Sequence, residues 1–144
     1  MAKFSKELPN DLIKVFEDLE TNCDFIFGKM CKAGAKVVYD NVIANMKKVF
    51  KSTKSLEKGL KITKVYKTPS DDAINVKVAF YGYVPDSKPT KRHPYGTPIP
   101  LIALAREYGT SQNEDKKPFL RPAFKKKDIE KAMKQVQDEY IKGD

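Results

Sequence analysis

The stretch that decides the fold is Asn10–Phe50, NDLIKVFEDLETNCDFIFGKMCKAGAKVVYDNVIANMKKVF, because its apolar residues recur at helical spacing without an interrupting proline. Its beginning coincides with a typical helix start, Pro9–Asp11. The first part of its apolar stripe alternates steps of four and three residues: Leu12, Phe16, Leu19, Cys23, Ile26, Met30, Ala33 and Val37. The stripe then continues through Val38, Val42, Met46 and Val49. The sequence predicts one long helix, or two nearly collinear helices, with Gly28 and Gly34 as the expected places for a bend.

A helix of this length is difficult to bury within one small domain. Forty helical residues extend roughly 60 Å, which exceeds the width of a compact domain of 144 residues. In one interpretation the whole stripe packs on the chain's own sheet. In the other, part of it, and first of all its N-terminal end, packs on a neighbouring copy of the chain. The sequence leaves both interpretations open.

The middle and the end of the chain contain further regular patterns. Residues 59–67 and 73–84 alternate apolar and polar side chains and are joined by the turn-forming residues 68–72, which predicts an antiparallel hairpin with lysines on its solvent side. Residues 101–108 are apolar and fit either a helix or a buried strand. Residues 125–142 form an amphipathic helical pattern whose apolar face consists of Ile129, Ala132, Met133, Val136 and Tyr140.

These elements predict a single α+β domain over residues 1–144. It would consist of the long N-terminal helix, an antiparallel sheet of three to four strands and the C-terminal amphipathic helix. Residues 52–58 are expected to form a polar connection. Two long loops are expected, at about residues 84–100, which carry five prolines, and at about residues 111–117.

The charge of the chain is strongly positive. There are 28 Lys and Arg residues against 19 Asp and Glu residues, a net charge of +9, which suggests an anionic partner such as nucleic acid or an acidic protein surface. Only Arg92, Arg106 and Arg121 are arginines, however, and arginine is the residue that base-reading and phosphate-clamping proteins favour. A solubilising, lysine-rich surface is therefore the first interpretation, and non-specific phosphate attraction is the alternative.

No pattern in the sequence indicates catalysis. The single histidine, His93, lies between Arg92 and Pro94 with no nucleophile beside it, and no phosphate loop or nucleophile elbow is present. Cys23 and Cys31 are eight residues apart, about 12 Å along a helix, which is too far for a disulfide. Both are expected to be reduced and buried in a cytoplasmic environment. The chain is expected to be no enzyme and to have no cofactor, metal, small-molecule substrate or membrane contact.

A proline-framed segment, Pro118–Phe124, follows a polar run and leads into the last helix. Pro118 and Pro122 restrict the backbone, so the segment is expected to be a preset arm that places Phe119 and Leu120 in a pocket. Both aromatic rings of the segment are expected to be packed. The pocket could belong to the same chain, or Arg121 and the preceding loop could lie at an interface between copies.

Together with the turn before it, this segment resembles a family of small tailed-bacteriophage proteins, the tail-completion or head–tail connector proteins of the "gene product ten" type. The family pattern has a Glu-aromatic-Gly-Thr turn, a variable polar loop, and Pro-Phe-Leu-Arg-Pro-Ala leading into a terminal helix. The matching residues are Glu107, Tyr108, Gly109, Thr110, Pro118, Phe119, Leu120, Arg121, Pro122 and Ala123. They span residues 107–123 when the loop between them is included, which is about an eighth of the chain.

The resemblance implies a structural virion protein. Copies of the chain would form a ring, expected to be a hexamer, at the head-proximal end of a phage tail or tail-like particle. The ring would contact the adjacent connector or tail-tube proteins, and its lumen could touch genome DNA non-specifically. The expected location is the virion tail or neck, with host cytoplasm during assembly. The loops at residues 85–100 and 112–117 are expected to reach toward neighbouring subunits. The alternative from a different class is a small basic protein that binds DNA non-specifically.

Overall fold

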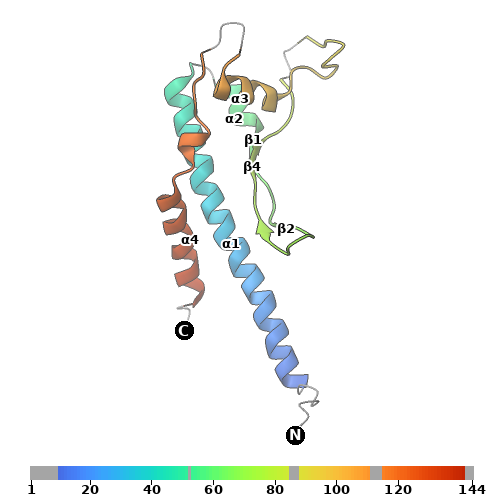
Figure 1. Cartoon of the computed structure of the whole chain (residues 1–144), viewed down its shortest axis with the longest axis vertical. Helices are drawn as coiled ribbons and strands as arrows, with labels where there is room; N and C mark the ends of the chain where they lie inside the picture. Colours follow the sequence, from blue (N-terminus) through green and yellow to red (C-terminus); the bar gives the residue numbers. More distant parts are fainter. Residues whose placement is uncertain (1–9, 52, 85–87, 111–114, 142–144) are drawn as a thin grey trace.

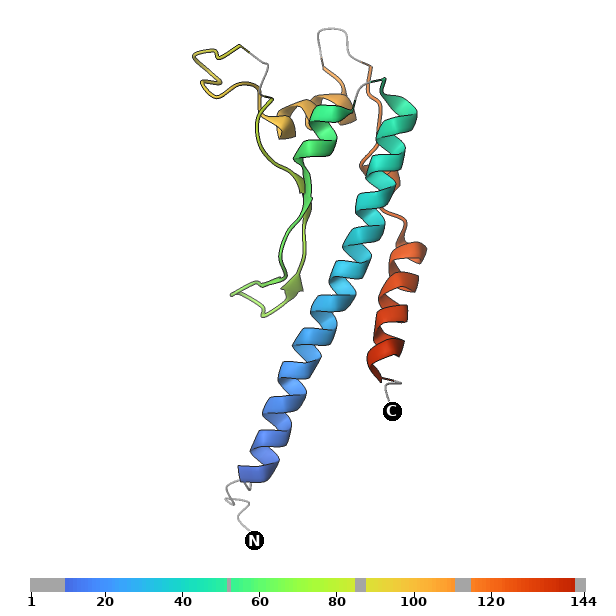
Figure 2. The ribbon, with the colours of Figure 1, turned by 180° about the vertical axis from the view of Figure 1, so that it is seen from behind.

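The computed structural model describes residues 10–51, 53–84, 88–110 and 115–141 of the chain. Its fold is α+β, as the sequence predicts. Helix α1 (Asn10–Val49) is one continuous helix of 40 residues along the length of the molecule (Figure 1). Helix α4 (Lys126–Ile141) packs antiparallel against α1, and the β hairpin lies on the other side of α1 (Figure 2). The long helix is therefore the central element that joins the other two.

The hairpin is confirmed, but it is divided into two short antiparallel ladders. Strand β1 (Leu60–Ile62) pairs with β4 (Val78–Phe80), and β2 (Tyr66–Lys67) pairs with β3 (Ile74–Asn75). Over the described residues there are therefore two two-stranded sheets in place of one sheet of three to four strands. Between the ladders, the Thr63 hydroxyl accepts a hydrogen bond of 2.8 Å from the backbone N–H of Lys77. This side-chain acceptor interrupts the regular pairing.

Two further helices flank the hairpin in the described chain, one before β1 and one after β4. Helix α2 (Lys54–Gly59) was not expected, because its six residues are too short to show a period; one apolar residue, Leu56, anchors it at 2% exposure. The apolar residues 101–108, for which the sequence allowed a helix or a strand, belong to helix α3 (Ile99–Tyr108). It starts after Pro98, so the loop predicted up to residue 100 ends earlier, and it stops at Gly109, whose φ of 77° favours glycine.

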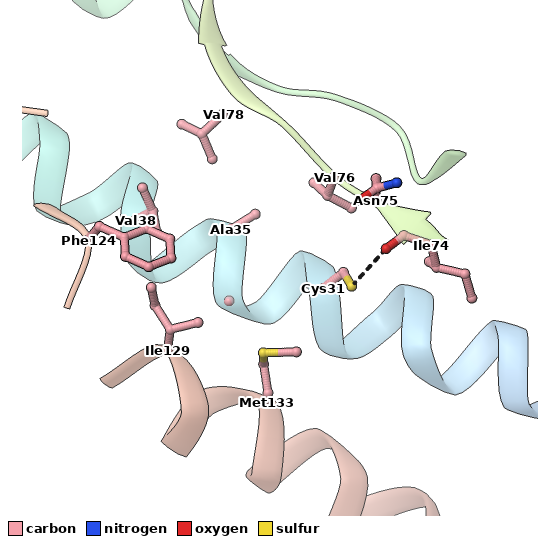
Figure 3. A pocket seen from close by; sticks show the side chains of 11 residues that line it. Cys31, Ala35, Val38, Ile74, Asn75, Val76, Val78, Phe124, Ile129 and Met133 are labelled. Carbon is pink, nitrogen blue, oxygen red and sulfur yellow. Dashed lines mark hydrogen bonds between the residues drawn. The ribbon is translucent and has the colours of Figure 1, made fainter. Parts of the chain in front are cut away.

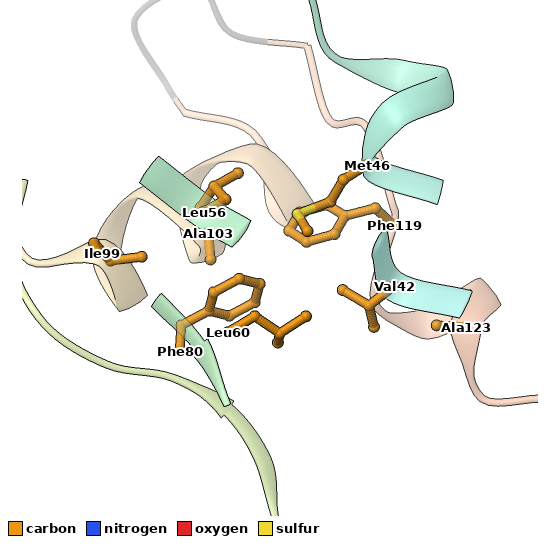
Figure 4. Close-up of a cluster of buried hydrophobic side chains, with 9 residues drawn as sticks. All are labelled: Val42, Met46, Leu56, Leu60, Phe80, Ile99, Ala103, Phe119 and Ala123. Atoms are coloured by element: carbon orange, nitrogen blue, oxygen red, sulfur yellow. The ribbon is translucent and has the colours of Figure 1, made fainter. Parts of the chain in front are cut away.

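The hydrophobic core lies at the end of α1 that is distant from the N-terminus (Figure 4). It is formed by side chains from α1, α2, β1, β4, α3 and the proline-framed segment: Val42, Met46, Leu56, Leu60, Phe80, Ile99, Ala103, Phe119 and Ala123. Burial of these side chains is the main favourable contribution to folding. The N-terminal part of α1 contributes nothing to this core.

Two expected burial assignments are wrong. Cys23 is exposed, because it lies on the part of α1 that no other described element covers, whereas Cys31 is half-buried and its Sγ lies 3.8 Å from the carbonyl oxygen of Ile74. Burial raises the pKa of the Cys31 thiol. Phe124 was expected to be packed like Phe119, but it is 67% exposed and is not part of the core.

Gly59 occupies a position where no side chain fits. A Cβ atom there would lie 2.6 Å from Cγ2 of Ile99 and 2.8 Å from the carbonyl oxygen of Tyr81. We expect Gly59→Ala to lower the free energy of unfolding by about 1–3 kcal/mol through overpacking. Urea denaturation measures this loss. The control is Gly28→Ala, whose Cβ would approach only the Val65 side chain at 3.3 Å and should change stability by less than about 1 kcal/mol. Equal losses for the two variants would contradict the explanation.

Candidate functional site

The two halves of the Glu107–Ala123 motif meet around one buried carboxylate. Glu107, in the last turn of α3, is 1% exposed. Its Oε2 accepts hydrogen bonds from the backbone N–H groups of Phe119, at 2.7 Å, and Leu120, at 2.9 Å. Its Oε1 accepts a third from the N–H of Arg121 at 3.2 Å. We call this arrangement the carboxylate clamp; it fixes the start of the proline-framed segment to the end of α3.

The clamp holds Glu107 in its ionised form. Burial by itself would raise the pKa of this carboxyl, but the backbone N–H groups of Leu120, Phe119 and Arg121, together with the Arg121 charge, outweigh it. The pKa of Glu107 therefore lies below its ordinary value. A carboxylate that accepts several backbone hydrogen bonds is stabilised as the anion, and here that anion organises the motif.

Arg121 covers the clamp from the solvent side. Its Nε lies 3.6 Å from Oε1 of Glu107, and its guanidinium lies over the ring of Tyr108, 4.6 Å from the centroid. Both partners of this stack are largely exposed, with 65% of the Arg121 side chain and 57% of Tyr108 accessible. The motif thus has a buried inner side and an exposed outer side, and Phe124 adds an exposed aromatic ring close by along the chain.

The inner side of the motif is part of the core. The Phe119 ring is fully buried and makes edge-to-face contacts with Phe50 and Phe80, at centroid distances of 5.4 and 6.1 Å. Helix α1 also holds the backbone of the segment, because the Asn45 side-chain amide donates to the carbonyl of Phe119 at 3.2 Å. The Asn41 amide donates in the same way to Ala123 at 3.1 Å. Of the two possible pockets for Phe119, the structure uses the one within its own chain.

The other motif residues have simpler positions. Ala123 is buried in the short 3-10 helix η1 (Arg121–Ala123), and Leu120 is half-buried against the core. Thr110, Pro118 and Pro122 are exposed. A contact between copies through this region stays a prediction. Residues 111–114 of the expected reaching loop, and residues 85–87 of the proline-rich loop, lie outside the described residues.

Sequence reasoning missed the role of Glu107 within the motif. The available signal was one acidic residue in an otherwise apolar and basic run, LIALAREY, followed twelve residues later by the segment that it holds. That signal says nothing about which backbone groups the carboxylate accepts from, because the partners are brought close only by the fold. Several segments, including α3 and α1, must be in place before the clamp exists.

Two of the grooves formed by the described residues lie along α1. The apolar groove, with a volume of about 360 Å³, lies between α1, the hairpin and α4, and Figure 3 shows Val38, Val78, Ile129 and Met133 around it with Phe124 at one side. A second groove, with a volume of about 470 Å³, lies between α1 and the residues at the end of β1. We call it the lysine groove, because Lys32, Lys36 and Lys64 line it. Both are open to solvent, and neither contains an arrangement of groups that indicates catalysis.

The remaining chemistry of the described residues is limited. In the described ranges, no three His, Cys, Asp or Glu side chains are placed to hold a metal ion. None of the helices over the same ranges is long and apolar enough to cross a membrane. His93 is half-buried, and its backbone forms hydrogen bonds with Thr90. No family model, no curated protein and no solved structure matches this chain.

Proposed function

We propose that this protein is a structural virion component that assembles with copies of itself into a ring at the head-proximal end of a phage tail or phage-tail-like particle. There it joins or terminates the tail tube as a tail-completion protein. The observation that carries the proposal is the Glu107–Ala123 motif. Its two halves, which resemble the pattern of tail-completion proteins, meet in one clamp that leaves Tyr108 and Arg121 exposed as a pair.

The type of surface on the molecule supports an assembly role. Aromatic residues and arginine are enriched in protein–protein interfaces, and the outer side of the motif presents Tyr108 and Arg121 as an exposed stacked pair. Phe124, three residues further along the chain, is exposed as well. A rigid backbone underneath lowers the conformational cost of using such side chains in a contact. The partners proposed are copies of the chain, adjacent connector or tail-tube proteins, and genome DNA as a non-specific contact.

Quantitative mass spectrometry of purified particles from the source organism tests the proposal. We expect the protein at a fixed low copy number, on the order of one ring or about six copies per particle. The control is a mock purification from the same lysate with particles removed, in which the protein should be depleted. Presence in the lysate but absence from particles would contradict the virion role.

The net charge of +9 favours a second candidate, non-specific DNA binding. Fluorescence anisotropy with random-sequence duplex DNA at several salt concentrations separates the two functions. As a ring component, the free protein should bind weakly and lose that binding near physiological salt. Tight binding with a steep salt dependence, together with absence from particles, would favour the DNA-binding function.

A further inference from the structure

The N-terminal end of α1 extends beyond everything else in the described fold. Every residue from Asn10 to Cys23 is exposed, and Figures 1 and 2 both show this part of the helix projecting past the ends of α4 and the hairpin. We call Asn10–Cys23 the arm. Its fourteen residues extend roughly 20 Å. No other described element buries the arm, and it interacts with the rest of the described residues through the electrostatic attraction between Glu20 and Lys67.

The arm has a strongly apolar stripe. Leu12, Phe16 and Leu19 recur at steps of four and three residues, with exposures of 38%, 53% and 52%. Ile13 and Val15 widen the stripe, at 38% and 52% exposure. Apolar anchors at this spacing are typical of a helix that docks in a groove of another protein surface. An exposed apolar stripe of this extent indicates an interaction site.

The charge of the arm is opposite to that of the rest of the chain. The arm has four acidic residues, Asp11, Glu17, Asp18 and Glu20, and one basic residue, Lys14, which gives a net charge of −3. Because the whole chain has a net charge of +9, the residues outside the arm sum to +12. Two arms side by side would repel each other, whereas an arm against the body of another copy would be attracted.

The lysine groove has the matching properties. Lys32, Lys36 and Lys64 line it, with Asp40 as its one acidic residue. Tyr39 and Ile62 supply half-buried apolar surface between these charges. An apolar stripe flanked by acidic side chains therefore fits this groove in both polarity and charge. The apolar groove of Figure 3 is lined mainly by uncharged side chains and lacks this charge match.

We propose that the arm of one copy docks in the lysine groove of the next copy. Each chain then donates an arm on one side and receives one on the other, which is a head-to-tail contact of the kind that closes into rings. The apolar stripe lies against Tyr39 and Ile62, and the acidic side chains face Lys32, Lys36 and Lys64. This inference rests on the self-assembly part of the proposed function and adds the contact that performs it.

A charge swap in the full-length protein tests the contact. The arm variant is Glu17→Lys with Asp18→Lys, and the groove variant is Lys36→Glu with Lys64→Glu; no ion pair within the described chain involves these four side chains. Each variant alone should weaken self-association about tenfold or more in analytical ultracentrifugation. Mixing the two variants in equal amounts should restore association, because in an alternating arrangement each substituted arm meets a substituted groove and each wild-type arm meets a wild-type groove. Combining all four substitutions in one chain should also restore association. Recovery by the combined variant distinguishes direct contact from general damage.

One control variant and one variant of the apolar stripe complete the test. The control, Asp115→Lys with Glu139→Lys, changes the net charge by the same amount as the arm variant, but at exposed positions outside the arm. It should leave association unchanged. Phe16→Ser with Leu19→Ser should abolish association, while circular dichroism shows an intact fold. A wild-type protein that remains a monomer at high concentration, or a charge swap without recovery, would overturn the arm contact. Neither result decides the virion role, which particle mass spectrometry tests separately.

Discussion

Replacing Phe119 by alanine is expected to lower the free energy of unfolding by about 3–5 kcal/mol. The aromatic ring of Phe119 is completely buried and contacts Phe50 and Phe80 edge to face. Its removal would leave a cavity where α1, α3 and the hairpin meet, and the helices around it cannot close that space without losing other contacts. Urea denaturation followed by circular dichroism measures the loss.

The chain offers a matched control for this substitution. Phe124 lies five residues further along the same segment and is 67% exposed. Phe124→Ala should change stability by less than about 1 kcal/mol, because an exposed side chain leaves no cavity. The contrary result would be that the two variants are equally stable and only Phe119→Ala fails to assemble. In that case the Phe119 side chain acts at a contact between copies, and its place in the core is refuted.

Replacing Glu107 by glutamine is expected to lower the free energy of unfolding by about 2–4 kcal/mol at neutral pH. The substitution keeps the shape of the side chain but replaces one acceptor oxygen with an NH₂ group. That group would face backbone N–H donors of Phe119, Leu120 or Arg121, so at least one buried donor would lose its acceptor. The measurement is again urea denaturation, with Glu139→Gln on the exposed surface of α4 as the control.

The contribution of Glu107 to the free energy of unfolding should also depend on pH. The pKa of this carboxyl is lower in the folded chain than its ordinary value of 4.5, so the folded state favours the ionised form. Its contribution to stability is complete above the unfolded pKa and is lost as the pH falls through the folded pKa. The stability difference between wild type and Glu107→Gln should therefore be largest at pH 7 and should shrink below about pH 4. A difference that stays constant from pH 7 to pH 3 would contradict the ionised clamp.

These variants also separate stability from assembly. Glu107→Gln and Phe119→Ala act on the inner side of the motif, while Arg121 and Tyr108 lie on its outer side. A chain with a weakened inner side should fold less stably yet associate normally at low temperature, provided the arm contact is intact. Loss of association without loss of stability is instead the expected signature of the arm variants.

The sequence by itself determined the elements that have a period. The spacing of Leu12, Phe16 and Leu19 is enough to predict a helix, because side chains three and four residues apart share a helix face. The alternation of residues 73–84 predicts half of a hairpin for the same reason, with a period of two. Both patterns are local, and the α+β class follows from their order along the chain.

The tertiary structure alone decided which of two similar residues is buried. Phe119 and Phe124 have the same side chain in the same segment, yet one is in the core and the other is in solvent, because the clamp and the two asparagines of α1 fix the direction of the backbone between them. The buried state of Glu107 and the exposed state of Cys23 depend in the same way on distant segments. Contacts between residues far apart in the chain leave no period in the sequence, so only the packed fold reveals them.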